Sequence, residues 1–63
     1  MELIQFMKDQ VTNGKNTMNV NNEELETLNK LKAEGYLLRF SFTYLEDGTY
    51  DIIFVPTEKF KYL

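Results

Sequence analysis

Three acidic residues near a turn, Glu46, Asp47 and Asp51, form the group in this sequence whose type and spacing suggest chemistry. Clustered carboxylates can bind a divalent cation or act as an acid and base pair. Acidic residues are equally typical of a type I turn at a solvated hairpin tip. The second interpretation accounts for all three residues without a ligand, so we predict no metal site here.

Composition excludes most other catalytic chemistry. The 63 residues include no cysteine and no histidine, which excludes disulfides, thiolate metal sites and imidazole ligands. A nucleophile would have to be a hydroxyl group assisted by a lysine or a carboxylate. The single serine, Ser41, falls on the polar side of a predicted strand. We therefore predict a protein that is not an enzyme, with no catalytic residue, cofactor or metal.

Aromatic residues in the second half of the chain suggest a platform for nucleic-acid bases. Such platforms interleave aromatics with Lys and Arg, whereas residues 36–54 contain one basic residue, Arg39, and the net charge is -3. Phosphate binding depends on clustered positive charge, and aromatics at strand spacing are more typical of a core. A nucleic-acid-binding module using Arg39, Lys59 and Lys61 is therefore the alternative to a protein-binding function.

Residues 35–55 have the pattern of a β-hairpin. Apolar side chains occupy the even positions 36–44 and 50–54, which is the period of a half-buried strand. A two-residue turn would place Tyr44 opposite Asp51. A three-residue loop with Gly48 in the left-handed conformation would pair Tyr44 with Tyr50 instead. The three-residue loop alone gathers the large apolar residues on one face, so we predict that register.

A first helix is predicted over residues 2–12, because Leu3, Ile4, Met7 and Val11 form one stripe. The following Asn-Gly pair is also typical of a hairpin turn. A hairpin there would pair Val11 with Asn16 and would make no consistent apolar face, so we favour a helix followed by a loop.

A second helix is predicted from about Asn22 to Glu34. Asn21 can cap its first turn, with Glu24 three residues later as the other half of a capping box. Gly35 can end it in a Schellman motif.

The sequence does not decide the secondary structure of two segments. Residues 17–20 alternate weakly, as in a short edge strand or an extended loop. After Pro56 ends the hairpin, residues 57–63 fit a terminal strand over 58–62, a helical turn capped by Thr57, or a frayed end.

These elements predict one α+β domain over residues 1–63, in the order α-α-β-β. Two helices would pack on one face of a C-terminal antiparallel hairpin. An extra strand at 17–20 or 58–62 is compatible with this arrangement.

The second face of the hairpin is the predicted site of partner binding. Its residues are Leu37, Leu45, Ile53 and Val55, with Phe60 and Tyr62 from the tail. We expect a protein partner or self-association as a homodimer, with an unpaired strand edge extending the sheet across a two-fold axis. The competing expectation is that the tail, through Phe60 and Tyr62, or residues 18–20 fold back as a third strand and cover this face.

The opening residues lack the basic and apolar runs of a signal peptide, and no stretch is long enough to span a membrane. The absence of cysteine fits a reducing cytoplasm. Abundant Asn and Lys in a small acidic protein suit an AT-rich bacterium or its phage. The sequence thus predicts a small non-enzymatic binding or regulatory protein that acts through protein contacts.

Overall fold

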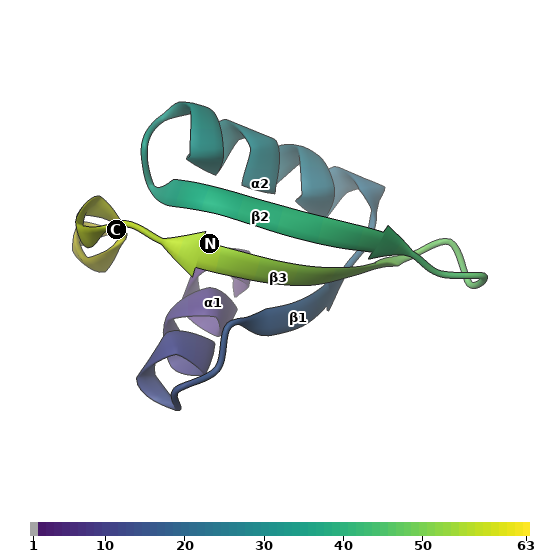
Figure 1. Cartoon of the computed structure of the whole chain (residues 1–63), viewed down its shortest axis with the longest axis horizontal. Helices are drawn as coiled ribbons and strands as arrows, with labels where there is room; N and C mark the ends of the chain where they lie inside the picture. Colours follow the sequence, from purple (N-terminus) through teal and green to yellow (C-terminus); the bar gives the residue numbers. More distant parts are fainter. Residues whose placement is uncertain (1) are drawn as a thin grey trace.

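The computed structural model describes residues 2–63, which form two α-helices, three β-strands and a short 3-10 helix (Figure 1). The elements in chain order are α1 Glu2–Thr12, β1 Thr17–Val20, α2 Asn22–Ala33, β2 Leu37–Tyr44, β3 Tyr50–Pro56 and η1 Glu58–Tyr62. The predicted α+β class is confirmed.

The three strands form one antiparallel sheet in the order β1-β3-β2. The open question at residues 17–20 is thereby answered: they form a strand, with Met18 opposite Ile52 and Val20 opposite Tyr50. β3 therefore lies in the centre of the sheet, and β1 and β2 are its two edges. The predicted hairpin is the larger part of this sheet rather than the whole of it.

The C-terminal segment is a 3-10 helix, so the alternative of a strand over 58–62 is wrong. Pro56 ends β3, and Thr57 then turns the chain toward the start of β2. The amide of Thr57 donates to the carbonyl of Tyr36 at 3.1 Å, and the Thr57 hydroxyl donates to the carbonyl of Gly35 at 2.6 Å. This turn directs Phe60 into the core, where it is buried.

The predicted hairpin register is confirmed. Tyr44 lies opposite Tyr50, and the pairing continues along both strands. The amide of Leu45 donates to the carbonyl of Thr49 at 2.8 Å, which closes a three-residue loop. Gly48 has a φ of 86°, a backbone conformation that costs a residue with a Cβ about 1 kcal/mol or more.

Both predicted ends of α2 are also present. The amide of Glu24 donates to the side chain of Asn21 at 2.9 Å, and the Glu24 carboxylate accepts from the Asn21 amide at 3.0 Å. At the other end, the amides of Tyr36 and Gly35 donate to the carbonyls of Leu31 and Lys32 at 2.9 and 3.1 Å. These bonds form a Schellman motif and fix where β2 begins.

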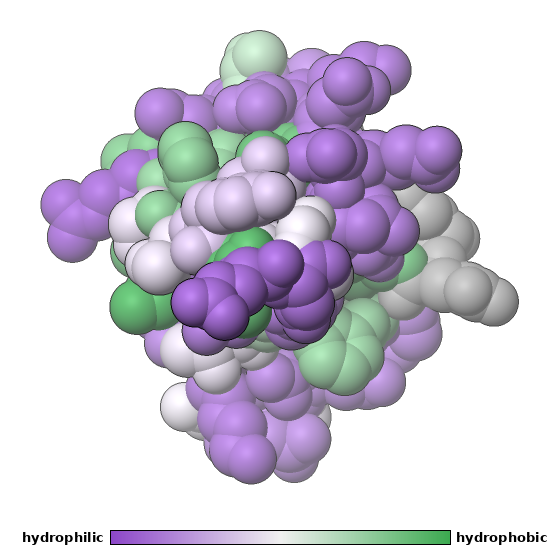
Figure 2. Space-filling model, turned by 90° about the vertical axis from the view of Figure 1, so that its right-hand side faces the viewer, coloured by the Kyte–Doolittle hydropathy of each residue, from purple (hydrophilic) through white to green (hydrophobic). Residues whose placement is uncertain are grey.

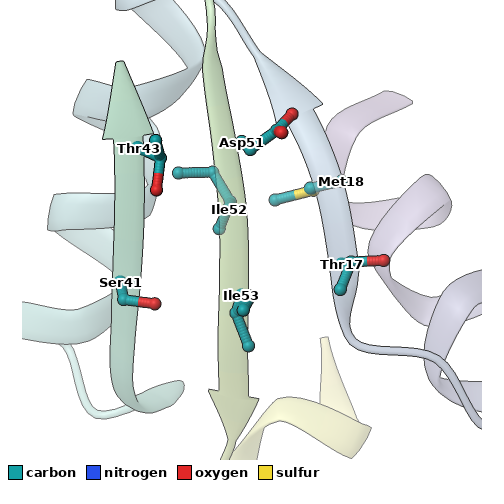
Figure 3. A pocket seen from close by; sticks show the side chains of 7 residues that line it. All are labelled: Thr17, Met18, Ser41, Thr43, Asp51, Ile52 and Ile53. Carbon is teal, nitrogen blue, oxygen red and sulfur yellow. The ribbon is translucent and has the colours of Figure 1, made fainter. Parts of the chain in front are cut away.

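The core lies between the sheet and the two helices. It is one cluster of buried side chains: Met7, Met18, Val20, Leu28, Leu31, Leu37, Ile52, Phe54 and Phe60. The residues from β1 and β3 are even-numbered, so the odd-numbered residues of these strands face away from the helices. Figure 3 looks onto that helix-free face, with both helices behind the strands.

The core does not extend to the hairpin tip. Phe42 and Tyr44 are on the core side of the sheet by register, yet they are 58% and 65% exposed. The expectation that the helices cover the whole even-numbered face is therefore wrong near the tip. The rings pack on each other instead, with Tyr50 edge-on to Phe42 at 5.8 Å and to Tyr44 at 5.3 Å between ring centroids.

Leu37 is a second correction, because it is buried in the core rather than placed on the helix-free face. The pairing of β2 with β3 is irregular between Leu37 and Arg39. An extra residue at such a bulge breaks the alternation of faces. Leu37 is consequently turned inward, and its neighbour Leu38 is 63% exposed.

The register predicts unequal effects of the same substitution at two adjacent isoleucines. Ile52 is 1% exposed and Ile53 is 52% exposed. Ile52→Val should lower the free energy of unfolding by about 0.5–1.5 kcal/mol, because it removes a buried methyl group. Ile53→Val, the matched control, should change it by less than about 0.5 kcal/mol. Chemical denaturation measures both, and equal losses would contradict the assigned faces.

Candidate binding surfaces

The helix-free face of the sheet is the surface on which partner binding was predicted. It contains an open hollow of about 410 Å³ lined by Thr17, Met18, Ser41, Thr43, Asp51, Ile52 and Ile53 (Figure 3). A second hollow of about 340 Å³ is lined by Asn16, Arg39, Phe40, Ser41, Ile53 and Val55. Small hydroxyl side chains dominate this face, and Ile53 stands between the two hollows.

The structure brings together two of the six predicted partner-binding residues. Ile53 and Val55 line the same hollow, and Val55 is partly buried. Leu45 is partly buried in the loop at the far end of β2. Tyr62 is 84% exposed, on η1.

The remaining two, Leu37 and Phe60, are each 2% exposed and belong to the core. The alternative that residues 18–20 fold back as a third strand is confirmed in part. β1 pairs with β3, so the strand edge expected to be open beside Ile53 is occupied. Met18 and Val20 are buried on the helix side, however, and Ile53 is left exposed.

Polar bonds further occupy this face near the tip. The amide group of Asn19 donates to the hydroxyl of Thr49 at 2.9 Å and to the carboxylate of Asp51 at 3.3 Å. A face with hydroxyl, amide and carboxylate groups is typical of the solvated side of an antiparallel sheet. It offers little apolar area beyond Ile53.

The acidic tip is a turn stabilised by its own hydrogen bonds. The Asp47 carboxylate accepts from the Thr49 hydroxyl at 2.6 Å and from the Thr49 amide at 3.0 Å. These bonds, the hydroxyl bond first, lower the pKa of Asp47 below its ordinary value. Among residues 3–63 no group of three or more acidic, His or Cys side chains is placed to hold a metal ion. Figure 2 looks onto this end of the molecule, where hydrophilic side chains stand in front.

The three basic residues of the nucleic-acid hypothesis lie on separate elements. Arg39 is exposed on β2. Lys59 donates to the carbonyl of Glu34 at 2.7 Å and lies 4.4 Å from the centre of the Tyr36 ring. Lys61 forms an ion pair with Glu58 at 3.6 Å. Two of the three therefore already have contacts within the chain.

The free edge of β2 is a surface that the sequence pattern did not single out. In an antiparallel pair, every second residue of a strand makes main-chain hydrogen bonds to the neighbouring strand. The bond from the Leu45 amide to the Thr49 carbonyl shows that the odd-numbered residues of β2 are the ones that bond to β3. Odd-numbered residues of β2 therefore direct their main-chain groups to β3. Phe40, Phe42 and Tyr44 direct theirs to the open side of the sheet.

Nothing in the described part of the chain satisfies these outward groups. No side chain or loop amide of residues 3–63 bonds to the main chain of Phe40, Phe42 or Tyr44. The side chains of Leu38, Phe42 and Tyr44 are more than half exposed along the same strand. We call this surface the β2 edge: the open main chain from Phe40 to Tyr44 together with exposed Leu38.

The sequence did contain a signal for this edge. The strand Leu-Leu-Arg-Phe-Ser-Phe-Thr-Tyr has one charged residue and no proline, whereas edge strands usually carry charges or proline that discourage pairing. Phe42 and Tyr44 were assigned to the core because their alternation matched that of Phe40. Alternation identifies a face, but it does not tell how far the helices cover it.

Comparison with known proteins gives no relative for this chain: no family model, no curated protein and no solved structure matches it. The helices described in residues 2–63 are too short and too polar to cross a membrane.

The bonds around Asp47 generate a prediction about pH. They favour the carboxylate form, so they stabilise the hairpin above the ordinary carboxyl pKa, and this contribution is lost as the pH falls through the lowered pKa. Thr49→Val removes the hydroxyl and should raise the titration midpoint of Asp47 toward its ordinary value. Thr43→Val should leave the midpoint unchanged. NMR titration of the side-chain carboxyl measures it, and an unaltered midpoint in Thr49→Val would show that the hydroxyl bond is absent.

Proposed function

We propose that this is a small non-enzymatic binding protein that acts through protein contacts, and that the β2 edge is its contact surface. The observation that carries the proposal is an edge strand with open main-chain groups and exposed aromatic side chains. Exposed edges of this kind are templates for pairing with another chain. A cytoplasmic location, to which the absence of cysteine is suited, belongs to the same proposal.

The physical support is that the β2 edge offers both affinity and selectivity. Pairing of solvent-exposed main-chain donors and acceptors contributes a modest net free energy of binding, while aromatic rings supply large apolar areas. Phe42 and Tyr44 expose more than half of their surface beside those groups. By contrast, the helix-free face exposes chiefly hydroxyl and charged groups around Ile53. Self-association through Ile53 and Val55 is thus the weaker form of the proposal.

Nucleic-acid binding through Arg39, Lys59 and Lys61 is the weaker alternative. Lys59 and Lys61 make contacts within the chain, and the net charge of -3 opposes binding to a polyanion.

A capture experiment with matched variants tests the proposal. Wild-type protein, Phe42→Lys and Thr17→Lys are immobilised and exposed to a bacterial lysate, once untreated and once treated with nuclease. Both substitutions add one charge to an exposed position of an edge strand, but Phe42 belongs to the β2 edge, whereas Thr17 lies on β1 at the other edge of the sheet. We expect proteins retained by the wild type to be lost, by about tenfold or more, with Phe42→Lys only, because a lysine at the centre of the contact must be desolvated.

Equal retention by all three forms would refute a role for the β2 edge. Loss with Thr17→Lys alone would place the contact on the helix-free face near β1. If capture disappears for the wild type when nuclease is added, the nucleic-acid alternative replaces the proposal. Circular dichroism of each variant verifies that the fold is retained.

A further inference from the structure

We infer that the β2 edge receives an extended segment of the partner as a fourth strand, and that this segment carries a carboxylate beside Arg39. The inference rests on the proposed function and names the chemistry of the partner. Three features of the described residues support it: the direction of the open main-chain groups, the position of α2, and the distribution of charge along β2.

The open main-chain groups specify a strand. Phe40, Phe42 and Tyr44 direct N–H and C=O groups outward at every second residue, which is the spacing that an added strand pairs with. The bulge at Leu38 interrupts this regular run, so pairing should extend from about Arg39 to Tyr44. A helical partner presents no free main-chain groups with this spacing.

The position of α2 disfavours a second folded copy as a two-fold partner at this edge. α2 packs more closely against β2 than against the other two strands, and it follows β2 along its length (Figure 1). For a helix directly above its strand, symmetric pairing of β2 with β2 would separate the two α2 axes by only about one strand spacing, ~5 Å. Packed helices need about 8–10 Å between axes. An extended segment without its own helix meets no such obstacle.

Charge distinguishes the two ends of the β2 edge. Its first half has Arg39 on the helix-free face, and the last turn of α2, just before β2 in the chain, carries Lys30 and Lys32. The acidic residues Glu46 and Asp47 follow the other end of β2. A carboxylate in the added strand is therefore favoured next to Arg39 and disfavoured next to the tip.

The two faces of the added strand should differ. Side chains on the helix side lie next to Phe40 and Phe42, which favours apolar residues. Side chains on the other face lie next to Arg39, Ser41 and Thr43, which favours polar residues and one acidic residue. The inferred partner segment thus alternates apolar and polar residues over about six positions and is acidic at one end.

Selection from a displayed library of random decapeptides against the immobilised full chain tests this inference. We expect enriched peptides that alternate apolar and polar residues and contain Asp or Glu. Repeating the selection on Arg39→Glu should replace the acidic residue with Lys or Arg. Lys15→Glu makes the same change of charge in the loop before β1 and should leave the acidic preference intact.

A synthetic copy of the most enriched peptide then tests the main-chain contacts by fluorescence anisotropy. Methylation of single backbone nitrogens should weaken binding by at least about tenfold at every second position and little at the positions between. Uniform sensitivity, or none, would overturn strand addition. If no peptide is enriched, or if Arg39→Glu selects the same acidic residue as the wild type, the inference is overturned. The proposed function would still hold in that case, provided that capture from the lysate depends on Phe42. A dimer in sedimentation that Phe42→Lys abolishes would make a second copy the occupant instead.

Discussion

The register of the β2–β3 hairpin is the constraint on which the rest of the structure depends. Gly48 in its left-handed conformation closes a three-residue loop, and this loop sets Tyr44 opposite Tyr50. The same register places Ile52 and Phe54 toward the helices and leaves Ile53 in water. It also determines which amides of β2 bond to β3 and which are left open. A shift by one residue would exchange the core face with the solvated face.

Local signals in the sequence were sufficient for the elements that depend on neighbouring residues. Asn21 and Glu24 cap α2, and Gly35 ends it, because these bonds form within a few positions of the chain. The loop around Gly48 was predictable for the same reason. The observed α2 ends one residue earlier than predicted, at Ala33, which is within the ordinary uncertainty of a helix boundary.

Features that depend on distant parts of the chain were not predictable in this way. Residues 17–20 become a strand because β3 offers them an open side, and Phe60 enters the core because Thr57 bonds to Gly35 and Tyr36. The bulge that turns Leu37 into the core and Leu38 toward solvent cannot be recognised from the alternation of apolar and polar residues. Phe42 is exposed because α2 does not cover that part of the sheet. The alternation of apolar residues does not show how far a helix extends over a sheet. For this reason the candidate surface included two residues that are buried and omitted two aromatics that are exposed.

The position of α2 relates the core to the proposed function. Its buried leucines stabilise the domain from one side of β2, while the strand itself stays without a neighbour on its outer side. A helix over an edge strand restricts symmetric pairing with another folded copy. It leaves room for a single extended chain. In the proposed function, the stability of the domain and the selectivity of binding thus depend on the same contact between α2 and β2.

Amide hydrogen exchange along β2 tests the central claim most directly, because it reports which main-chain groups are bonded. We expect slow exchange at Arg39, Ser41 and Thr43, whose amides bond to β3, and fast exchange at Phe40, Phe42 and Tyr44 in the isolated protein. Measured by NMR at low protein concentration, this alternation should be visible over the whole strand. Protection of the even-numbered amides to the same degree as the odd-numbered ones would mean that the edge is already covered, and would contradict the account.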